Sequence, residues 1–192
     1  MAPRKKVEKE LTREMIMDAA RELFSQEGYQ NVSMRKIAKE LDYSHGAIYY
    51  HFQNKAELFY ALVDQDFHLL DLTVERILSL PLERSEKLKE ILLGFIEFGL
   101  THPSHYEIMF LIKDEEVQYH VQAAPDTSYR KFAEAVSTLS QGSPTVQQIW
   151  SIFLSLHGFV AHYWRHGTPY NEVQSLAEAH VSFILKALEQ TA

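Results

Sequence analysis

The sequence predicts an all-α protein with a three-helix N-terminal domain, a larger C-terminal helical bundle and about nine helices in total. Two observations predict this class. Apolar residues recur every three or four positions along nearly the whole chain, which is the spacing of one face of a helix. Short segments rich in glycine and proline separate these stretches, and no strand-like alternation interrupts them.

The composition sets limits on the class of protein. The chain has 192 residues, of which 46% are hydrophobic, enough for one or two compact domains with a substantial core. It contains no cysteine, which excludes disulfides, thiolate metal sites and a cysteine nucleophile. The N-terminal segment lacks the apolar core of a signal peptide, and no apolar run approaches the roughly 18 residues that span a bilayer. We therefore expect a cytoplasmic protein.

The net charge of −7 is unevenly distributed. Residues 1–55 contain ten Lys and Arg against eight Asp and Glu, whereas residues 56–192 contain nine against eighteen. A slightly basic N-terminal domain before an acidic one is compatible with phosphate contact by the first domain only. So small an excess is equally compatible with no role in nucleic-acid binding. We place the domain boundary between residues 55 and 56.

The first helix is predicted over residues 12–27. Thr12 is a suitable N-cap, apolar residues follow at helical spacing from Ile16 to Leu23, and Gly28 can end the helix.

Three further N-caps predict the next three helices. Ser33 can cap a helix over residues 33–41, and Ser44 can cap a third helix that runs to Tyr50. Asn54 can cap a long fourth helix that ends before Pro81. Since only "DYS" separates the second and third helices, this is a helix-turn-helix arrangement, in which the second member lies in the DNA major groove.

The third helix has an unusual composition for its length. Gly46 costs about 1 kcal/mol relative to alanine inside a helix, which suggests that a partner comes close to the backbone there. Tyr49, Tyr50 and His51 carry hydroxyl and imidazole groups that can reach phosphates or base edges. Lys55, in the first turn of the fourth helix, adds positive charge beside free backbone N–H groups.

Within the same segment, Ile48 and Phe52 are predicted to face the core.

The remainder of the chain predicts five more helices. They cover residues 84–101, 103–113, 126–140, 144–166 and 171–189, separated by "THP", "AAPD", "QGSP" and "HGTPY".

Residues 11–60 resemble the DNA-binding domain of the tetracycline-repressor (TetR) family of transcriptional regulators. The resemblance is carried by "AARELFSQEGY" in the first helix, by the S-x-x-x-IA pattern in the second, and by G-x-x-Y-x-x-F-x-x-K-x-x-L across the third and fourth. It implies that the protein binds a palindromic operator as a dimer. The DNA-contacting residues that it implies are Arg35, Tyr43, Ser44, His45, Gly46, Tyr49, Tyr50, His51 and Lys55. A histidine at position 45 departs from the basic or small polar residue often found there.

The C-terminal part is similar to one TetR subgroup in which a tryptophan precedes a His-Gly pair, here Trp150, His157 and Gly158. This similarity implies a domain that senses a ligand and dimerises.

Apolar stripes on the last two predicted helices suggest a dimer interface. One stripe runs from Ile149 to Tyr163 and the other from Val173 to Leu188. Two such helices can pair with their symmetry copies in a four-helix contact. The alternative is that both stripes only close the core of the monomer.

Aromatic residues with polar neighbours suggest an effector pocket in the C-terminal part. The predicted ligand-binding residues are Phe67, His68, His102, Tyr106, Met109, Phe110, Trp150, Phe153 and His157. Mostly apolar walls with a few polar groups are typical of ligand pockets, and they suggest a small hydrophobic or aromatic effector. The alternative is that these residues only pack the core.

Metal and enzyme functions have less support. Glu116 and His120 stand four residues apart, as do His162 and His166, so each pair could offer two metal ligands on one helix face. Two ligands do not complete a site, and exposed pairs of this kind are usually solvated. No glycine-rich elbow or phosphate loop frames a catalytic set. We predict no metal, no cofactor and no catalytic residue.

These observations together predict a ligand-responsive transcriptional regulator, most simply a repressor that a small effector releases from its operator. The fourth helix would couple the two sites, because it starts at Lys55 and continues past Phe67. The alternative functions are a helical enzyme that handles a metal or a small molecule, and a protein adaptor without a specific DNA site.

Overall fold

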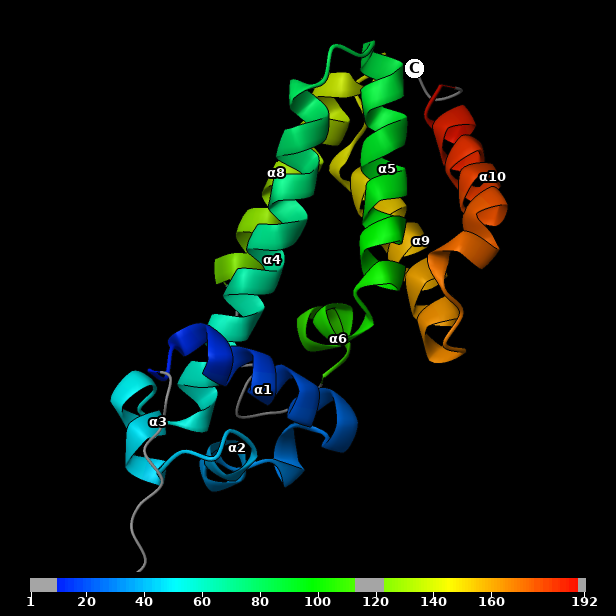
Figure 1. Cartoon of the computed structure of the whole chain (residues 1–192). Helices are drawn as coiled ribbons and strands as arrows, with labels where there is room; N and C mark the ends of the chain where they lie inside the picture. The colour runs from blue at the N-terminus through cyan, green and yellow to red at the C-terminus, as the bar shows by residue number, and fades with distance from the viewer. Residues whose placement is uncertain (1–9, 113–122, 190–192) are drawn as a thin grey trace, which may run out of the picture. The chain divides into compact units, whose positions relative to one another are not determined.

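The computed structural model describes residues 10–112 and 123–189, and every regular element in these ranges is helical (Figure 1). The predicted all-α class is confirmed. The chain divides into two compact units. Within the described ranges, the first unit contains residues 10–65 and 107–112, and the second contains residues 66–106 and 123–189. None of the described helices is both long enough and apolar enough to cross a membrane.

The first unit is a set of short helices around a small core. Its elements are α1 (Arg13–Glu27), the 3-10 turn η1 (Tyr29–Asn31), α2 (Met34–Glu40), α3 (His45–His51), the start of α4 (Lys55–Ser79) and the π-helical turn η2 (Glu107–Leu111). The predicted starts are confirmed, because Thr12, Ser33 and Ser44 each accept a hydrogen bond from a backbone N–H three residues later. Asn54 caps α4 in the same way, accepting from the N–H of Glu57 at 2.8 Å.

The core of the first unit contains the residues that the sequence placed there. Ile48 and Phe52 are fully buried, as predicted. The rings of Phe24, Tyr29 and Phe59 form a cluster with centroid separations of 5.1 to 5.6 Å. Aromatic pairs at this spacing contribute beyond the area that they bury, so the cluster ties the start of α4 to α1 and η1.

The first unit extends beyond the predicted boundary at residue 55. The chain belongs to it as far as Gln65, because Leu58, Phe59 and Leu62 are buried. The chain also returns to it at η2, which packs against α1, and Ser25 Oγ donates a hydrogen bond to Glu107 Oε2 at 2.7 Å. The boundary therefore follows contacts that are distant in sequence.

The second unit is a bundle built around one central helix. Its elements are the remainder of α4, α5 (Arg84–Thr101), α6 (Pro103–Tyr106), α8 (Ala123–Leu139), α9 (Val146–Arg165) and α10 (Tyr170–Glu189). The predicted helix over residues 103–113 is instead α6 followed by η2. Here Ile112 N–H bonds to the carbonyl five residues earlier, on Glu107, at 3.0 Å, and the helical pattern changes.

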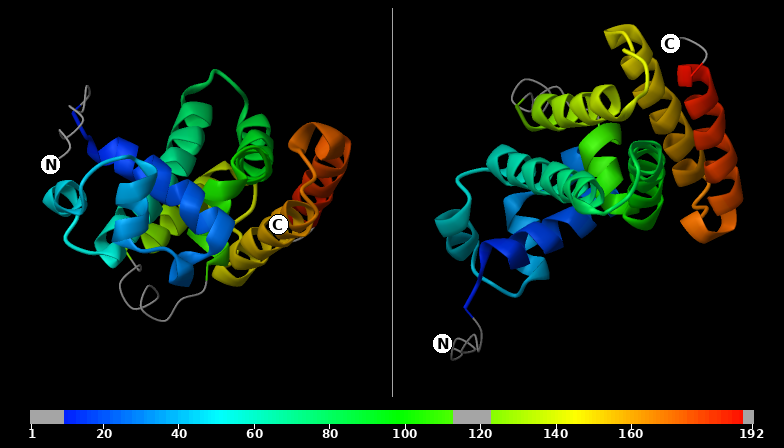
Figure 2. Two further views of the ribbon diagram at one scale, coloured as in Figure 1. Left: turned by 60° about the horizontal axis from the view of Figure 1, so that its bottom comes forward. Right: turned by 90° about the horizontal axis from the view of Figure 1, so that it is seen from above.

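Helix α5 is the central element of this bundle. Over residues 91–100 it is buried at every position except Glu97, and it packs against α6, α8, α9 and α10 (Figure 2). Its glycines allow close approach: a Cβ on Gly99 would lie 2.5 Å from Val160 Cγ1 and 2.9 Å from Tyr106 Cδ2. No side chain larger than hydrogen fits without a shift of its neighbours.

Helices α9 and α10 use most of their predicted stripes inside the monomer. Ile149, Ile152, Leu156 and Val160 of α9 are buried. So are Val173 and Ile184 of α10, whereas Leu176 is 53% exposed. The stripes therefore close the core of the second unit, which is the alternative that the sequence left open. Large apolar residues outside the stripes also remain exposed on the two helices: Val146, Trp150, Leu154 and Phe183.

Candidate nucleic-acid interface and aromatic cluster

A tight turn between α2 and α3 positions the exposed face of α3. After α2 ends, Asp42 adopts a positive φ of 59°, and the Tyr43 N–H bonds to the Ala38 carbonyl at 3.0 Å. This is a Schellman-type helix end, for which the left-handed conformation is required. Aspartate adopts that conformation more readily than most non-glycine residues, so the short join is formed at low cost.

The exposed face of α3 carries aromatic and polar groups. Tyr49 and Tyr50 are 43% and 87% exposed, far more than core tyrosines. The His45 and Tyr49 rings meet edge to face at 4.5 Å, and those of Tyr50 and His51 at 5.2 Å. Both ring pairs form within α3. These contacts orient the side chains, and they do not require the polar atoms to enter the core.

Gly46 lies on the same face with open space in front of it. A Cβ at this position would meet nothing within 4 Å. Its φ is not in the left-handed region that favours glycine, so neither packing in the chain nor the backbone conformation requires glycine here. The fold of the monomer gives no reason for a residue that weakens a seven-residue helix.

Several cations of the first unit are engaged in internal contacts. Arg13 Nη1 donates to the His51 carbonyl at 2.6 Å, and its guanidinium lies 4.0 Å from the centroid of the Phe52 ring. Lys36 pairs with Glu27. Lys55 Nζ donates to the Tyr29 carbonyl at 2.8 Å and lies 3.9 Å from the centroid of its ring.

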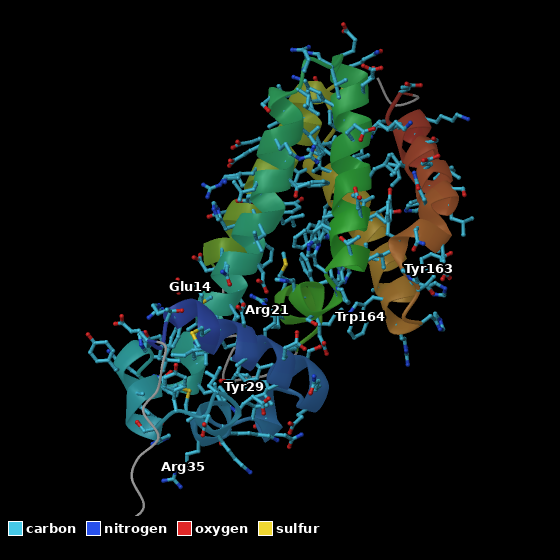
Figure 3. The ribbon with its side chains drawn as sticks, in the orientation of Figure 1. Glu14, Arg21, Tyr29, Arg35, Tyr163 and Trp164 are labelled. Atoms are coloured by element: carbon cyan, nitrogen blue, oxygen red, sulfur yellow. The ribbon has the colours of Figure 1, made fainter. Side chains whose placement is uncertain are left out.

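The Lys55 side chain is not freely solvated, because its hydrogen bond to the Tyr29 carbonyl anchors α4 to η1. An ammonium has three N–H donors, and the contact with the Tyr29 carbonyl uses one of them. Arg35 and Lys39 of α2 are exposed, and the Arg35 side chain extends away from the helix (Figure 3). These two residues are therefore accessible cations beside α3.

The second unit brings several of the predicted pocket residues together. A nearly parallel series of rings runs from Trp150 through Phe153 and His157 to Tyr106, with centroid separations of 5.3, 6.1 and 5.7 Å. Trp150 is 46% exposed, whereas Tyr106 is fully buried. The series therefore leads from the surface of the bundle into its core.

The buried end of this series holds a polar pair. Tyr106 Oη lies 2.5 Å from His157 Nδ1 and 3.3 Å from the His157 carbonyl oxygen. Burial raises the pKa of Tyr106 well above its usual value and lowers the pKa of His157. The native state therefore favours a neutral phenol bonded to a neutral imidazole, which is the cheapest way to place both in an apolar core.

The other predicted ligand-binding residues differ in burial and in the unit to which they belong. Phe67 is buried on α4, but the next residue, His68, is exposed. His102 is also exposed, and its ring stacks on Phe98 at 5.0 Å. Met109 and Phe110 belong to the first unit.

Two further rings, those of Tyr129 and Phe132 on α8, were not predicted from the sequence; they contact Phe153 with centroid separations of 5.6 and 6.2 Å. Their spacing of three residues on a predicted amphipathic helix was the available signal.

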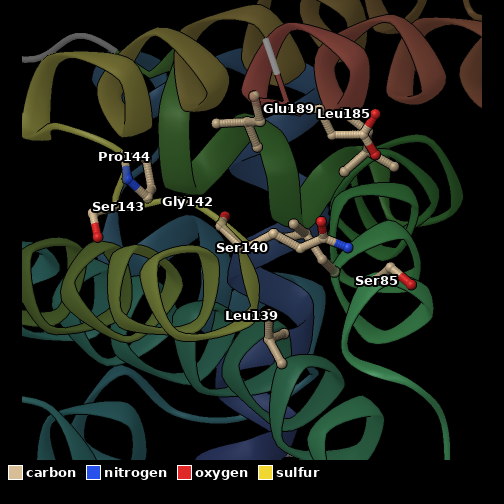
Figure 4. Close-up of a pocket in the computed structure, with 11 residues that line it drawn as sticks. Ser85, Leu139, Ser140, Gly142, Ser143, Pro144, Leu185 and Glu189 are labelled. Atoms are coloured by element: carbon tan, nitrogen blue, oxygen red, sulfur yellow. The ribbon is translucent and has the colours of Figure 1, made fainter. Parts of the chain in front are cut away.

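A small pocket occurs in another part of the second unit (Figure 4). It is lined by the start of α5, the loop between α8 and α9 and the end of α10, including Ser85, Leu139, Ser140 and Leu185. Its volume is about 60 Å³, which is suited to water molecules and not to a larger organic effector.

No group of three or more possible metal ligands occurs in residues 10–112 and 123–189. The predicted Glu116 and His120 pair lies outside these residues.

Comparison with known proteins identifies the N-terminal domain. Residues 16–62 match the model of the bacterial regulatory proteins of the tetR family. These residues therefore form a DNA-binding domain of the tetR type. The match covers α1, α2 and α3 and the start of α4, the same elements that carry the exposed α3 face.

TetR relatives extend the comparison beyond this domain. The chain is 34% identical to the HTH-type transcriptional regulator AcrR of Shigella flexneri over 113 residues, which are 58% of this chain and 53% of that relative. The chain thus matches about half the length of AcrR.

Solved TetR-like structures share the fold of nearly the whole chain. The fatty acid degradation regulator FadR of Bacillus halodurans superposes with a TM-score of 0.74 at 17% identity, covering 95% of this chain and 96% of FadR. AibR, solved in complex with isovaleryl coenzyme A and operator DNA, superposes with a TM-score of 0.60 at 21% identity, covering 75% and 83%. At these identities the likeness shows the fold.

The His157 environment predicts a pH dependence of stability. Because burial lowers its pKa in the native state, the unfolded chain takes up a proton at higher pH than the native one. The stability that the neutral, buried His157 contributes is fully present above the unfolded-state pKa of about 6.5. It is lost as the pH falls from there to the folded-state pKa. Urea unfolding at pH 7.5 and 5.5 should show a smaller loss of stability on acidification in His157→Gln than in the wild type. An equal loss in both proteins would contradict this role.

Proposed function

We propose that this protein is a ligand-responsive transcriptional regulator of the TetR family that represses its target genes. It binds a palindromic operator as a homodimer, and a small hydrophobic or aromatic effector releases it. The observation that carries the proposal is the exposed α3 face, with two accessible tyrosines and open space at Gly46, inside a TetR DNA-binding domain. Such a protein acts in the cytoplasm, where the DNA is, and needs no catalytic activity.

The proposed DNA interface divides between base edges and phosphates. Ser44, His45 and Tyr49 lie at positions on α3 from which side chains can reach base edges in the major groove. Phosphate contacts fix the position of the protein on DNA without reading its sequence. We assign these contacts to the remaining predicted residues: Arg35, Tyr43, Tyr50, His51 and Lys55.

Gly46 supplies the sharpest argument for a partner at this face. A methyl group there would meet nothing in the chain, and alanine favours a helix by about 1 kcal/mol over glycine. Glycine at this position therefore costs stability, and close approach of the DNA backbone to α3 is a reason for it.

Gly46→Ala should raise the melting temperature of the protein and weaken operator binding by about tenfold or more, because the added methyl occupies the space proposed for DNA. Arg35→Ala should instead weaken binding to operator and to scrambled DNA alike and reduce the salt dependence by about one charge per subunit. Fluorescence anisotropy on both duplexes at several salt concentrations measures these effects. A stabilised Gly46→Ala protein with unchanged operator affinity would remove α3 from the interface.

The homodimer is proposed to form through the exposed faces of α9 and α10. On α9, Val146, Trp150, Leu154 and Gly158 follow each other at four-residue spacing and are all exposed. On α10, Phe183 is 71% exposed. Helices α9 and α10 lie side by side (Figure 2). Large apolar side chains on adjacent helices are typical of an interface, and a two-fold contact uses the same face of both subunits.

Gly158 provides a test of this dimer that separates it from folding. A Cβ there would meet nothing within 4 Å in the chain, so a side chain costs no internal strain. Gly158→Leu should fold and yet dissociate into monomers, because its side chain holds the two α9 ridges apart. Gly158→Ala is the matched control, with a single methyl and higher helix propensity. Sedimentation at several concentrations measures the association, and a Gly158→Leu dimer as tight as the wild type would exclude this face.

The effector is proposed to bind at the aromatic cluster of the second unit. Its rings offer apolar walls, and the Tyr106–His157 pair offers a phenol and an imidazole that can exchange their mutual hydrogen bond for one to a ligand. AibR, which shares this fold, was solved with an acyl coenzyme A. An effector with an apolar body and one polar group fits both observations.

Two continuous stretches of the chain connect the effector site to the DNA-binding domain and can carry the signal. Helix α4 is continuous from Lys55 in the first unit to Ser79 in the second. Tyr106 bonds to α9, and the next residue, Glu107, accepts a hydrogen bond from Ser25 of α1. A ligand that displaces Tyr106 or tilts α4 would therefore disturb elements that hold α3 in place.

Linkage gives the test of this coupling. An effector that releases the protein from DNA must bind less tightly when operator is present, by about 5- to 150-fold for a coupling of about 1 to 3 kcal/mol. A panel of fatty acyl and aromatic compounds can be screened by thermal shift, and the affinity of each hit measured by calorimetry with and without operator. Equal affinities with and without operator would show that the compound does not act as an inducer. Coupling through α4 and Tyr106 would then be excluded for that compound.

A further inference from the structure

The last turn of α9 carries two imidazoles on one exposed face. His162 and His166 stand four residues apart, both are exposed, and their ring centroids are 4.9 Å apart. The sequence spacing alone did not distinguish a solvated pair from a metal-binding pair. The structure adds the ring positions and shows which nitrogens are available.

Most histidines of the second unit already use a ring nitrogen. His102 Nδ1 bonds to Thr101, His105 to Asp66, His157 to Tyr106 and His180 to Ser155. Across residues 10–112 and 123–189, neither the His162 nor the His166 side chain enters a hydrogen bond or an ion pair; both rings only contact aromatic rings. Their nitrogens are therefore available to an external ligand.

The ring separation fits two imidazoles bound to one metal ion. A transition metal binds an imidazole nitrogen at about 2.0–2.1 Å, so the ring centroid lies about 3.2 Å from the metal. Two rings at about 90° to 110° on the metal then have centroids roughly 4.5 to 5.2 Å apart. The observed 4.9 Å lies inside this interval, so small rotations of exposed side chains are enough to aim both nitrogens at one ion.

The position on the helix also favours a cation. The last carbonyls of a helix carry partial negative charge, and His162 and His166 lie at the end of α9, near Tyr163 (Figure 3). Imidazole selects borderline-soft divalent ions over Mg²⁺ and Ca²⁺, which prefer oxygen ligands. We infer that His162 and His166 form a two-ligand site for a divalent transition metal such as Cu²⁺, Ni²⁺ or Zn²⁺, with water in the remaining positions.

Calorimetric titration of the untagged full chain with NiCl₂ tests this site. One Ni²⁺ should bind per chain, and His162→Gln and His166→Gln should each weaken binding at least tenfold, because chelation is reduced to one imidazole. His68→Gln, a lone exposed imidazole on α4, and His120→Gln, from the other four-residue pair, are the controls and should bind as the wild type does. MgCl₂ should give no binding heat.

The affinity order Cu²⁺ above Ni²⁺ is a second expectation, since nitrogen sites follow this order. Circular dichroism checks that the variants fold, which both exposed positions permit. Absence of Ni²⁺ binding, or binding that survives both substitutions, would overturn the site. Loss of binding in His120→Gln with retention in His162→Gln would also overturn it.

Discussion

Tyr106 places a phenol in the centre of the second unit, and the surrounding elements are arranged so that its hydroxyl is satisfied there. Its ring fits because Gly99 of α5 carries no side chain, and its hydroxyl lies 2.5 Å from the His157 nitrogen. A buried hydroxyl without a partner costs more than a formed hydrogen bond contributes. The packing of α5, α6 and α9 and the position of His157 therefore depend on this one side chain.

The same side chain stands where the chain passes between its two units. Tyr106 belongs to the second unit and Glu107 to the first, and the helical hydrogen-bond pattern changes at this peptide. Burial raises the pKa of Glu107, against the effect of the hydrogen bond from Ser25, so a partly buried carboxyl follows the buried phenol in the sequence. Polar groups bonded to different elements at adjacent positions make this segment a natural route for coupling, independently of α4.

Gly46 and Gly158 are informative because contacts within the monomer do not explain why these positions are glycine. Gly99 is required by contacts inside the second unit, whereas Gly46, the second residue of α3, and Gly158, in the middle of α9, face open space, and alanine has the higher helix propensity. One lies on the proposed DNA-binding face and the other on the proposed dimer face. A residue that costs stability and has no internal reason is best explained by a partner that approaches the backbone.

The sequence by itself determined the first four helices, their caps at Thr12, Ser33, Ser44 and Asn54, and the inward direction of Ile48 and Phe52, because these depend on local spacing and on hydrogen bonds three residues apart. Only the tertiary structure decided which pocket residues meet. His68 and His102 have the same polar tips as His157, yet they are exposed, because the helix face that a neighbour covers is set by contacts distant in sequence. Contacts distant in sequence also decide that the first unit extends to Gln65 and that the Lys55 ammonium donates a hydrogen bond to the Tyr29 carbonyl.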